Sequence, residues 1–267
     1  MSAVVAGLAA AVLTGVARLG PGDGSIAGPS VAAPAGPMCL ASPPSGRLRL
    51  DLIQAEDAAT IAAVARREGL PDFAVTVAFT AALQESKLRN PASGDLDSVG
   101  VFQQRPSQGW GAPEQLQVPS VAAAGFFGAL VRVPNWQAMT VAEAAQAVQH
   151  SAGGDAYQQW EHQATILTDA LTGHTPAAFA CRFPESASAP VAGPDPLPAA
   201  MAAELGPVDL AAPMAEDAGW AVATWLVAHA AAYHVSSVAF MGRVWTPTSG
   251  DWKPQSPGSA YIQVGRS

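Results

Sequence analysis

The chain has 267 residues, of which 49% are hydrophobic, and its 13 basic and 21 acidic residues give a formal net charge of −8. This length is sufficient for one full domain with a buried core and a smaller second domain. Nucleic-acid-binding domains usually carry a basic face, so the acidic balance argues against nucleic acid as a partner.

The first segment of the chain is apolar and uncharged. Residues 2–17 carry no charge and precede Arg18. Export signals contain an apolar stretch of this kind but normally begin with Lys or Arg, and a membrane-spanning helix needs roughly 20 apolar residues. We therefore expect residues 1–19 to be a signal peptide or a membrane anchor. Residues 20–46 contain 6 Gly and 6 Pro without a periodic apolar face, which predicts a disordered spacer over 20–48.

Apolar periodicity and capping signals predict a mostly helical domain over residues 49–182. Gly69 is expected to end a first helix and Pro71 to begin a second one. Thr140 and Glu143 form a capping-box pattern that is typical of a helix start. A short strand-like insertion is expected between the second and third helices. The five expected helices span about 54–68, 71–85, 121–131, 140–150 and 155–172.

A single acidic residue, Glu85, closes the second expected helix. Residues 73–83 are apolar apart from two threonines, which is typical of a helix that is buried on all sides. Burial disfavours the charged form of a carboxyl group, so it would raise the pKa of Glu85 and let the group hold a proton near neutral pH. A proton donor to a leaving group needs this property. The alternative is a solvated Glu in the last helical turn, beside Lys87.

Two short motifs around Glu85 are spaced as in a known family. Glu85 is followed by Ser86, and residues 100–103 read Gly-Val-Phe-Gln, with a proline three residues beyond. This pattern resembles the lysozyme-like lytic transglycosylases, whose Glu-Ser motif precedes a Gly-Leu-Met-Gln motif and a proline. Residues 84–88 and 94–111 are still more similar to secreted, actinobacterial-type lysozyme-like proteins. The resemblance implies a lysozyme-like fold that cleaves peptidoglycan, with one Glu acting first as acid and then as base.

Two further acidic residues, Asp95 and Asp97, lie in the loop after the Glu85 helix. Hydrolysis of a glycosidic bond usually needs a second carboxylate as base or nucleophile, and these two are the candidates. The alternative is a structural role, because short Asp side chains in turn-rich stretches cap backbone amides. If neither Asp is catalytic, the resemblance implies the transglycosylase route, in which the 6-hydroxyl of muramic acid attacks internally.

Further polar and aromatic residues are candidate substrate contacts. The tetrad at 100–103 is expected to form a strand-like edge beside the acid, where Gln103 offers both an amide donor and an acceptor. Residues 147–157 match only loosely the family's third motif, a Tyr-Asn-Ala-Gly-like turn with an aromatic hydroxyl near the acid. The alternative for the aromatic residues is packing in the core. The candidates are Ser86, Gln103, Gln104, Trp110, Gln149 and Tyr157, together with Asp95 and Asp97.

The two cysteines, Cys39 and Cys181, flank the expected helical domain. An exported chain with two cysteines permits a single disulfide. Because the loop it would close is long, the chain-entropy model gives a stabilisation of about 4–5 kcal/mol. A lipid-modified Cys39 is the competing interpretation, but the preceding Pro-Met pair does not resemble a lipobox. Neither cysteine has the spacing of a metal ligand, and no metal is expected.

The C-terminal part is expected to be separate from the helical domain. Residues 183–216 are rich in Pro and Ala and predict a linker, and residues 217–267 predict a small α/β module. Through Arg243-Val244-Trp245 the module resembles the last part of the zinc D-alanyl-D-alanine carboxypeptidase-like fold. The histidines that bind zinc in that family are absent, so we expect a degenerate, non-catalytic wall-binding or docking module. Its expected elements are a helix at 219–233 and strands near 238–245 and 261–264.

These features predict a mainly α protein: a lysozyme-like helical domain with a short β-like insertion, followed by a small α/β module. The expected function is a secreted or cell-envelope lytic transglycosylase or lysozyme-like glycosidase that cleaves the MurNAc-GlcNAc bond of peptidoglycan glycan strands. We expect a monomer without cofactor that contacts a membrane only through its N-terminal segment. The alternative is a non-catalytic cell-wall-binding protein. The sequence contains no HExxH or GxSxG motif, which argues against a metallopeptidase or a serine hydrolase.

Overall fold

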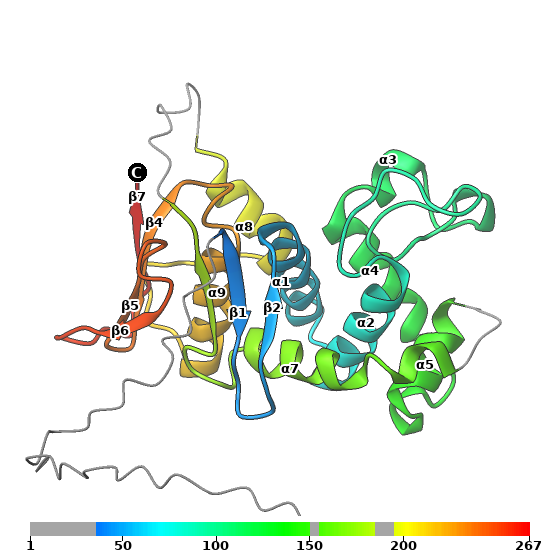
Figure 1. The fold of residues 1–267 in the computed structure, drawn as a ribbon, viewed down its shortest axis with the longest axis horizontal. Coiled ribbons are helices and arrows are strands. Elements are labelled where there is room, and N and C mark those ends of the chain that lie inside the picture. The colour runs from blue at the N-terminus through cyan, green and yellow to red at the C-terminus, as the bar shows by residue number, and fades with distance from the viewer. Residues whose placement is uncertain (1–35, 150–154, 185–194) are drawn as a thin grey trace, which may run out of the picture. The chain divides into compact units, whose positions relative to one another are not determined.

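The computed structural model of the chain describes residues 36–149, 155–184 and 195–267 (Figure 1). Within this part, helices are combined with two small antiparallel sheets, so the protein is mixed rather than purely helical. The helices are α1 (Leu52–Arg67), α2 (Asp72–Glu85), η1 (Pro106–Gln108), α3 (Pro113–Leu116), α4 (Pro119–Leu130), η2 (Trp136–Ala138), α5 (Val141–Gln149), α6 (Asp155–Gln158), α7 (Glu161–Leu171), α8 (Leu197–Leu205) and α9 (Glu216–Ala228). The strands are β1 (Met38–Ala41), β2 (Leu48–Leu50), β3 (Phe179–Arg182), β4 (Val235–Phe240), β5 (Arg243–Trp245), β6 (Trp252–Pro254) and β7 (Gln263–Arg266).

Helices α1 and α2 form the centre of the helical region. Asp51 and Gln54 start α1 through a capping box, in which each side chain accepts a hydrogen bond from the other residue's backbone amide, at 2.9 and 3.0 Å. Helix α2 is buried along most of its length, as its uncharged sequence predicts. It packs against α1, α4, α5 and α7, and its last residue is the candidate acid Glu85.

The helices of this region lie within a few residues of their predicted bounds. Thr140 starts α5 as predicted, since its amide and hydroxyl both donate to Glu143 Oε2 at 2.8 Å. His150, which the sequence places at the end of this helix, lies outside the described residues. The single helix predicted over 155–172 is divided into α6 and α7, because the chain turns where the Trp160 amide bonds to the Tyr157 carbonyl.

The first sheet has the order β2-β1-β3 and joins the two ends of the helical region. Cys39 and Cys181 are direct partners across β1 and β3, and their disulfide confirms the predicted bridge. Disulfides are typical of proteins that fold in an oxidising, extracellular environment. The expected spacer over 20–48 is wrong for its last part, because residues 38–41 form β1, where backbone pairing and the burial of Cys39 and Ala41 outweigh the Gly- and Pro-rich composition.

The second sheet has the order β6-β5-β4-β7 and is accompanied by α8 and α9. The single strand predicted near 238–245 is a hairpin of β4 and β5, because Met241 and Gly242 have positive φ and turn the chain. The expected linker over 183–216 contains α8, whose buried residues recur every four positions and form an apolar stripe. These residues are Leu197, Met201 and Leu205.

Helix α9 joins the second sheet to the helical region. It packs against α1, α7, β3 and β4. Gly219 permits the close approach to β4, since a Cβ at this position would lie 2.0 Å from the ring of Phe240. The indole N–H groups of Trp245 and Trp252 donate to carbonyl oxygens in β3, at 2.9 and 2.8 Å. The residues of the C-terminal part therefore share one core with the helical region.

Candidate active site

Glu85 lies at the point where the buried helix α2 reaches the following loop. Its side chain is half-buried, and the hydroxyl of Tyr157 donates a hydrogen bond to Oε1 at 2.8 Å. Burial raises the pKa of Glu85 above its ordinary value, while the Tyr157 hydrogen bond and the charge of Lys87 act in the opposite direction. Glu85 thus retains its proton to a higher pH than an exposed Glu does.

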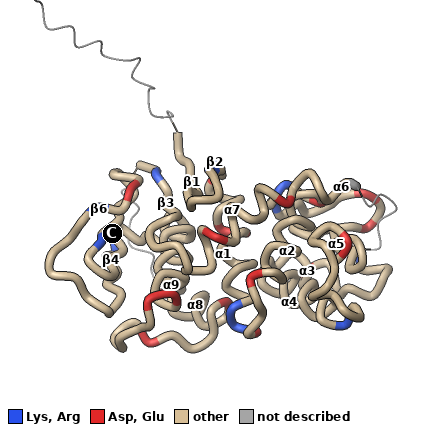
Figure 2. Tube along the Cα trace, turned by 90° about the horizontal axis from the view of Figure 1, so that it is seen from below, with Lys and Arg blue, Asp and Glu red and all other residues tan. Residues whose placement is uncertain are grey.

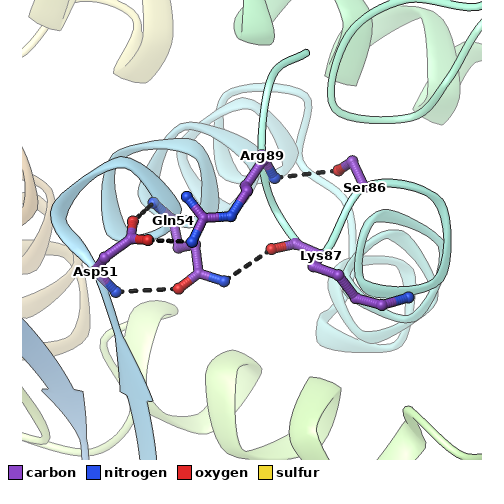
Figure 3. A network of polar contacts seen from close by, with 5 residues as sticks. All are labelled: Asp51, Gln54, Ser86, Lys87 and Arg89. Atoms are coloured by element: carbon purple, nitrogen blue, oxygen red, sulfur yellow. Dashed lines mark hydrogen bonds and ion pairs between the residues drawn. The ribbon is translucent and has the colours of Figure 1, made fainter. Parts of the chain in front are cut away.

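The loop after the candidate acid is held by a network of polar contacts from the start of α1 (Figure 3). Lys87 has a φ of 59°, a left-handed conformation that is uncommon for residues other than Gly. Gln54 Nε2 donates to the Lys87 carbonyl at 2.9 Å, and Arg89 forms an ion pair with Asp51. The Arg89 amide donates to Ser86 Oγ at 3.1 Å. The capping residues of α1 therefore also hold the backbone that follows α2.

Ser86 connects the end of α2 to the tetrad at residues 100–103. Its hydroxyl donates to the Val101 carbonyl at 2.7 Å, so the two motifs that are separated in the sequence lie side by side. The predicted strand-like edge is wrong, because the tetrad is a turn. Val99 and Gln104 pair on either side of it and leave the four residues between them to reverse the chain.

The two glutamines of this turn bond to the protein itself. Gln103 accepts a hydrogen bond from the Ser98 hydroxyl at 2.9 Å and donates to the Gly100 carbonyl at 3.1 Å. Gln104 is only 1% exposed, and its Nε2 donates to the Ala122 carbonyl of α4 at 3.1 Å. The prediction of Gln104 as a substrate contact is therefore corrected, because its side chain lies in the core and fixes the turn to α4.

The candidates from the loosely matched third motif lie at the site. Tyr157 is 1% exposed and reaches Glu85 through its hydroxyl, which is where the resemblance places an aromatic hydroxyl. Gln149 Nε2 donates to the Phe102 carbonyl at 2.9 Å and so links α5 to the tetrad. Trp110 is half-buried and packs against the core, as the alternative interpretation expects.

The two aspartates of the loop differ in their surroundings. Asp97 accepts hydrogen bonds from Arg105 Nε and from the Ser107 amide, both at 2.7 Å. These contacts, the Arg105 contact first, hold the pKa of Asp97 well below its usual range. Asp95 is exposed, and its backbone carbonyl accepts a hydrogen bond from the Ser98 amide at 3.0 Å. For Asp97 the geometry favours the structural role, because its carboxylate closes the loop onto η1.

The sequence analysis did not predict a cluster of three side chains beside Glu85, formed by Gln84, Lys87 and Trp160. Trp160 Nε1 donates to Gln84 Oε1 at 2.8 Å, and Lys87 Nζ lies 4.4 Å from the centroid of the Trp160 ring. Trp160 is half-buried and contacts the residues on either side of the acid in the sequence, Gln84 and Lys87. Only a contact across 76 positions brings Trp160 to Gln84, and helical periodicity carries no such information.

Some features are absent from the part of the chain that the structure describes. No group of three or more His, Cys, Asp or Glu residues there is arranged to hold a metal ion. None of the helices in the same part has both the length and the apolar character to cross a membrane. Glu85 lines neither the cavity between α1, α2 and α9 nor the one between α8 and β7. In comparisons with known proteins, no family model and no curated protein matched this chain.

Proposed function

We propose that the protein is an exported, peptidoglycan-cleaving glycosidase of the lysozyme-like, lytic transglycosylase type, with Glu85 as its catalytic acid. The observation that carries this proposal is the half-buried carboxyl group of Glu85 at the end of a core helix, with the Tyr157 hydroxyl at 2.8 Å. Burial favours the protonated carboxyl that a leaving group requires. The nearby Glu-Ser and Gly-Val-Phe-Gln motifs, joined by the Ser86 hydroxyl, support the same assignment.

The proposed reaction begins with proton transfer. Glu85 donates its proton to the glycosidic oxygen between MurNAc and GlcNAc as the C1–O bond breaks and an oxocarbenium-like centre forms. The Tyr157 hydroxyl, which bonds to Oε1, stabilises the carboxylate that results. Glu85 then removes the proton of the 6-hydroxyl of the same MurNAc, whose oxygen forms the new bond to C1. The product is a 1,6-anhydro sugar, and Glu85 is protonated again.

The single-carboxylate route is preferred to hydrolysis because of the surroundings of the two aspartates. Asp97 is engaged by Arg105 and Ser107, which leaves its carboxylate a poor base. Asp95 is exposed, and no hydrogen bond to a described residue positions its carboxylate. In the proposal, Ser86, Gln103 and Gln149 keep the tetrad in place beside the acid. The protein would act as a monomer on glycan strands outside the cytoplasm, without a cofactor.

The second candidate function is binding of the cell wall without turnover. It is favoured by the surroundings of Asp97, whose carboxylate is held by Arg105 and Ser107 and so supplies no second catalytic carboxylate for hydrolysis. In this case the lysozyme-like fold would be retained as a recognition scaffold.

The two functions are separated by incubating the full chain with purified peptidoglycan and analysing the soluble fragments by mass spectrometry. Release of 1,6-anhydromuropeptides would support the transglycosylase, and reducing ends would indicate hydrolysis. Sedimentation with the wall but no release would favour binding. Glu85→Gln should abolish cleavage and Asp95→Asn should not. Cleavage by the Glu85→Gln variant at the rate of the unmodified protein would disprove the assignment of the acid.

A further inference from the structure

A cavity of about 520 Å³ lies at the opposite end of α2 from Glu85. Asp72, the first residue of α2, forms part of its wall, and the 14 residues of the helix place Glu85 about 20 Å away. The other walls come from α1, the α1–α2 turn, the C-terminal ends of α7 and α8, and the middle of α9. The cavity has the size of small-molecule sites, which commonly form where two parts of a protein meet.

The floor of the cavity is apolar and built from short side chains. Ala59, Ala62 and Ala63 lie on one face of α1, since residues three and four apart in a helix are neighbours. Because these side chains are only methyl groups, they leave the cavity empty where larger side chains would fill it. Leu171 and Trp225 complete the apolar surface. This floor suits a ligand with methyl-sized apolar groups.

Two arginines, Arg66 and Arg67, line the cavity together with one carboxylate, Asp72. Arg66 and Arg67 lie in the last turn of α1, and elsewhere Lys and Arg are scattered along the described chain (Figure 2). Arg67 donates to the Ala203 carbonyl and forms an ion pair with Glu68 at 3.4 Å, and the Asp72 carboxylate lies 3.3 Å from His174 Nε2. The Arg66 guanidinium forms no hydrogen bond or ion pair with any residue that the structure describes, and it is exposed at the cavity. It therefore offers its full set of donors to a ligand.

We propose that this cavity binds the terminal carboxylate of a short peptide with alanine-sized side chains. The planar guanidinium of Arg66 matches a carboxylate in a two-point hydrogen bond, and the alanine floor accommodates the methyl groups beside it. Thr172 and Thr224 line the same cavity; the Thr172 hydroxyl donates to the Thr168 carbonyl and can accept a hydrogen bond from a peptide N–H. Such a ligand has two possible sources: cell-wall peptides, which end in D-alanine, and fragments of degraded proteins, which end in L-residues.

The proposal is tested by isothermal titration calorimetry on the full chain. The probes are N-acetyl-D-alanyl-D-alanine, its L,L counterpart, the carboxamide of each, and inorganic phosphate. Arg66→Gln should weaken dipeptide binding about tenfold, because it removes a charge-assisted hydrogen-bond pair. Ala62→Leu fills the floor and should abolish binding, with circular dichroism as the check of folding. Arg132→Gln, at an exposed arginine outside the cavity, is the matched control and should bind as the unmodified protein does.

Several results would overturn the proposal. These are no dipeptide binding at millimolar concentration, equal binding of the carboxamides, equal affinity of Arg66→Gln and the unmodified protein, and displacement of the dipeptide by phosphate at equal concentration. If binding holds, a preference for the D,D dipeptide identifies a wall peptide as the source, and a preference for the L,L dipeptide identifies a protein fragment. The titration does not depend on glycan cleavage, so this proposal and the proposed function fail separately.

Discussion

Asp57 is a buried carboxyl group at the contact between α1 and the C-terminal helices, and its replacement by Asn provides a test of how that contact depends on pH. The side chain is 5% exposed, and its Oδ2 has no hydrogen-bond partner among the described residues. Burial, together with the charges of Glu56 and Glu204, raises the pKa of Asp57 from 3.8 to about 7. The folded protein therefore binds a proton here between about pH 4 and pH 7, where the unfolded chain has released it.

The sign and size of the effect follow from this difference in proton binding. A group whose pKa is raised in the folded state lowers the free energy of unfolding as the pH rises through that window. With 1.36 kcal/mol for each pKa unit, the loss reaches on the order of 4 kcal/mol above pH 7. About half of it has already occurred at pH 5 to 6. Asp57→Asn carries no proton to lose, so its stability should not show this part of the pH dependence.

Thermal unfolding of Asp57→Asn and of the unmodified protein at pH 5 and pH 8 measures the difference. On going from pH 5 to pH 8, the variant should gain on the order of 2–3 kcal/mol relative to the unmodified protein, which corresponds to about 5–10 °C in Tm for a chain of this size. The buried amide of Asn adds a cost that does not depend on pH and cancels in this comparison. Asp251→Asn removes a charge at an exposed position and should follow the unmodified protein. Parallel pH profiles of Asp57→Asn and the unmodified protein would refute the reasoning.

Three further substitutions test the candidate site, the cap of α1 and the disulfide. Tyr157→Phe removes a hydrogen bond that lowers the pKa of Glu85, so the pKa of Glu85 should rise further in this variant. A ¹³C NMR titration of the Glu85 carboxyl carbon measures the change, and an unchanged or lower pKa would contradict the role of this bond. Gln54→Ala loses the side-chain bond of the capping box and the bond to the Lys87 carbonyl, and it should lower the free energy of unfolding measured in urea by about 1–2 kcal/mol. Gln54→Glu keeps an acceptor for the cap but loses the bond to Lys87, so equal losses in both variants would contradict a role for that bond. Replacing Cys39 and Cys181 together by Ser should cost about 4–5 kcal/mol, and an unchanged Tm would count against the chain-entropy argument.

The local features of the chain could be predicted from the sequence because they depend on neighbouring residues. Apolar runs, caps and Gly stops place α1, α2, α4 and α5 within a few residues of their observed bounds. The same logic identifies Glu85 as an acid at the end of a buried helix, with a pKa raised by that burial. The disulfide follows from the presence of two cysteines in a chain with an export-like start.

Composition was misleading where tertiary packing outweighs it. The Gly- and Pro-rich stretch before the helical region predicts a spacer, yet residues 38–41 pair with β3 and are held by a disulfide. The Pro- and Ala-rich stretch near α8 predicts a linker, yet three apolar residues in that helix are buried against the rest of the core. In both places, contacts to distant segments supply stability that local composition does not reveal.

The sequence alone was therefore enough to predict helices α1, α2, α4 and α5, the disulfide and the candidate acid. The neighbours of that acid that the sequence could not give are Trp160, which bonds to Gln84 from 76 positions away, and the α1 cap that holds the following loop. The sequence also did not predict that Gln104 lies in the core, or that an alanine-lined cavity lies between α1 and α9. The physical reason is that a repeating apolar pattern fixes which face of a helix is buried, whereas the partner of that face depends on how all segments pack together.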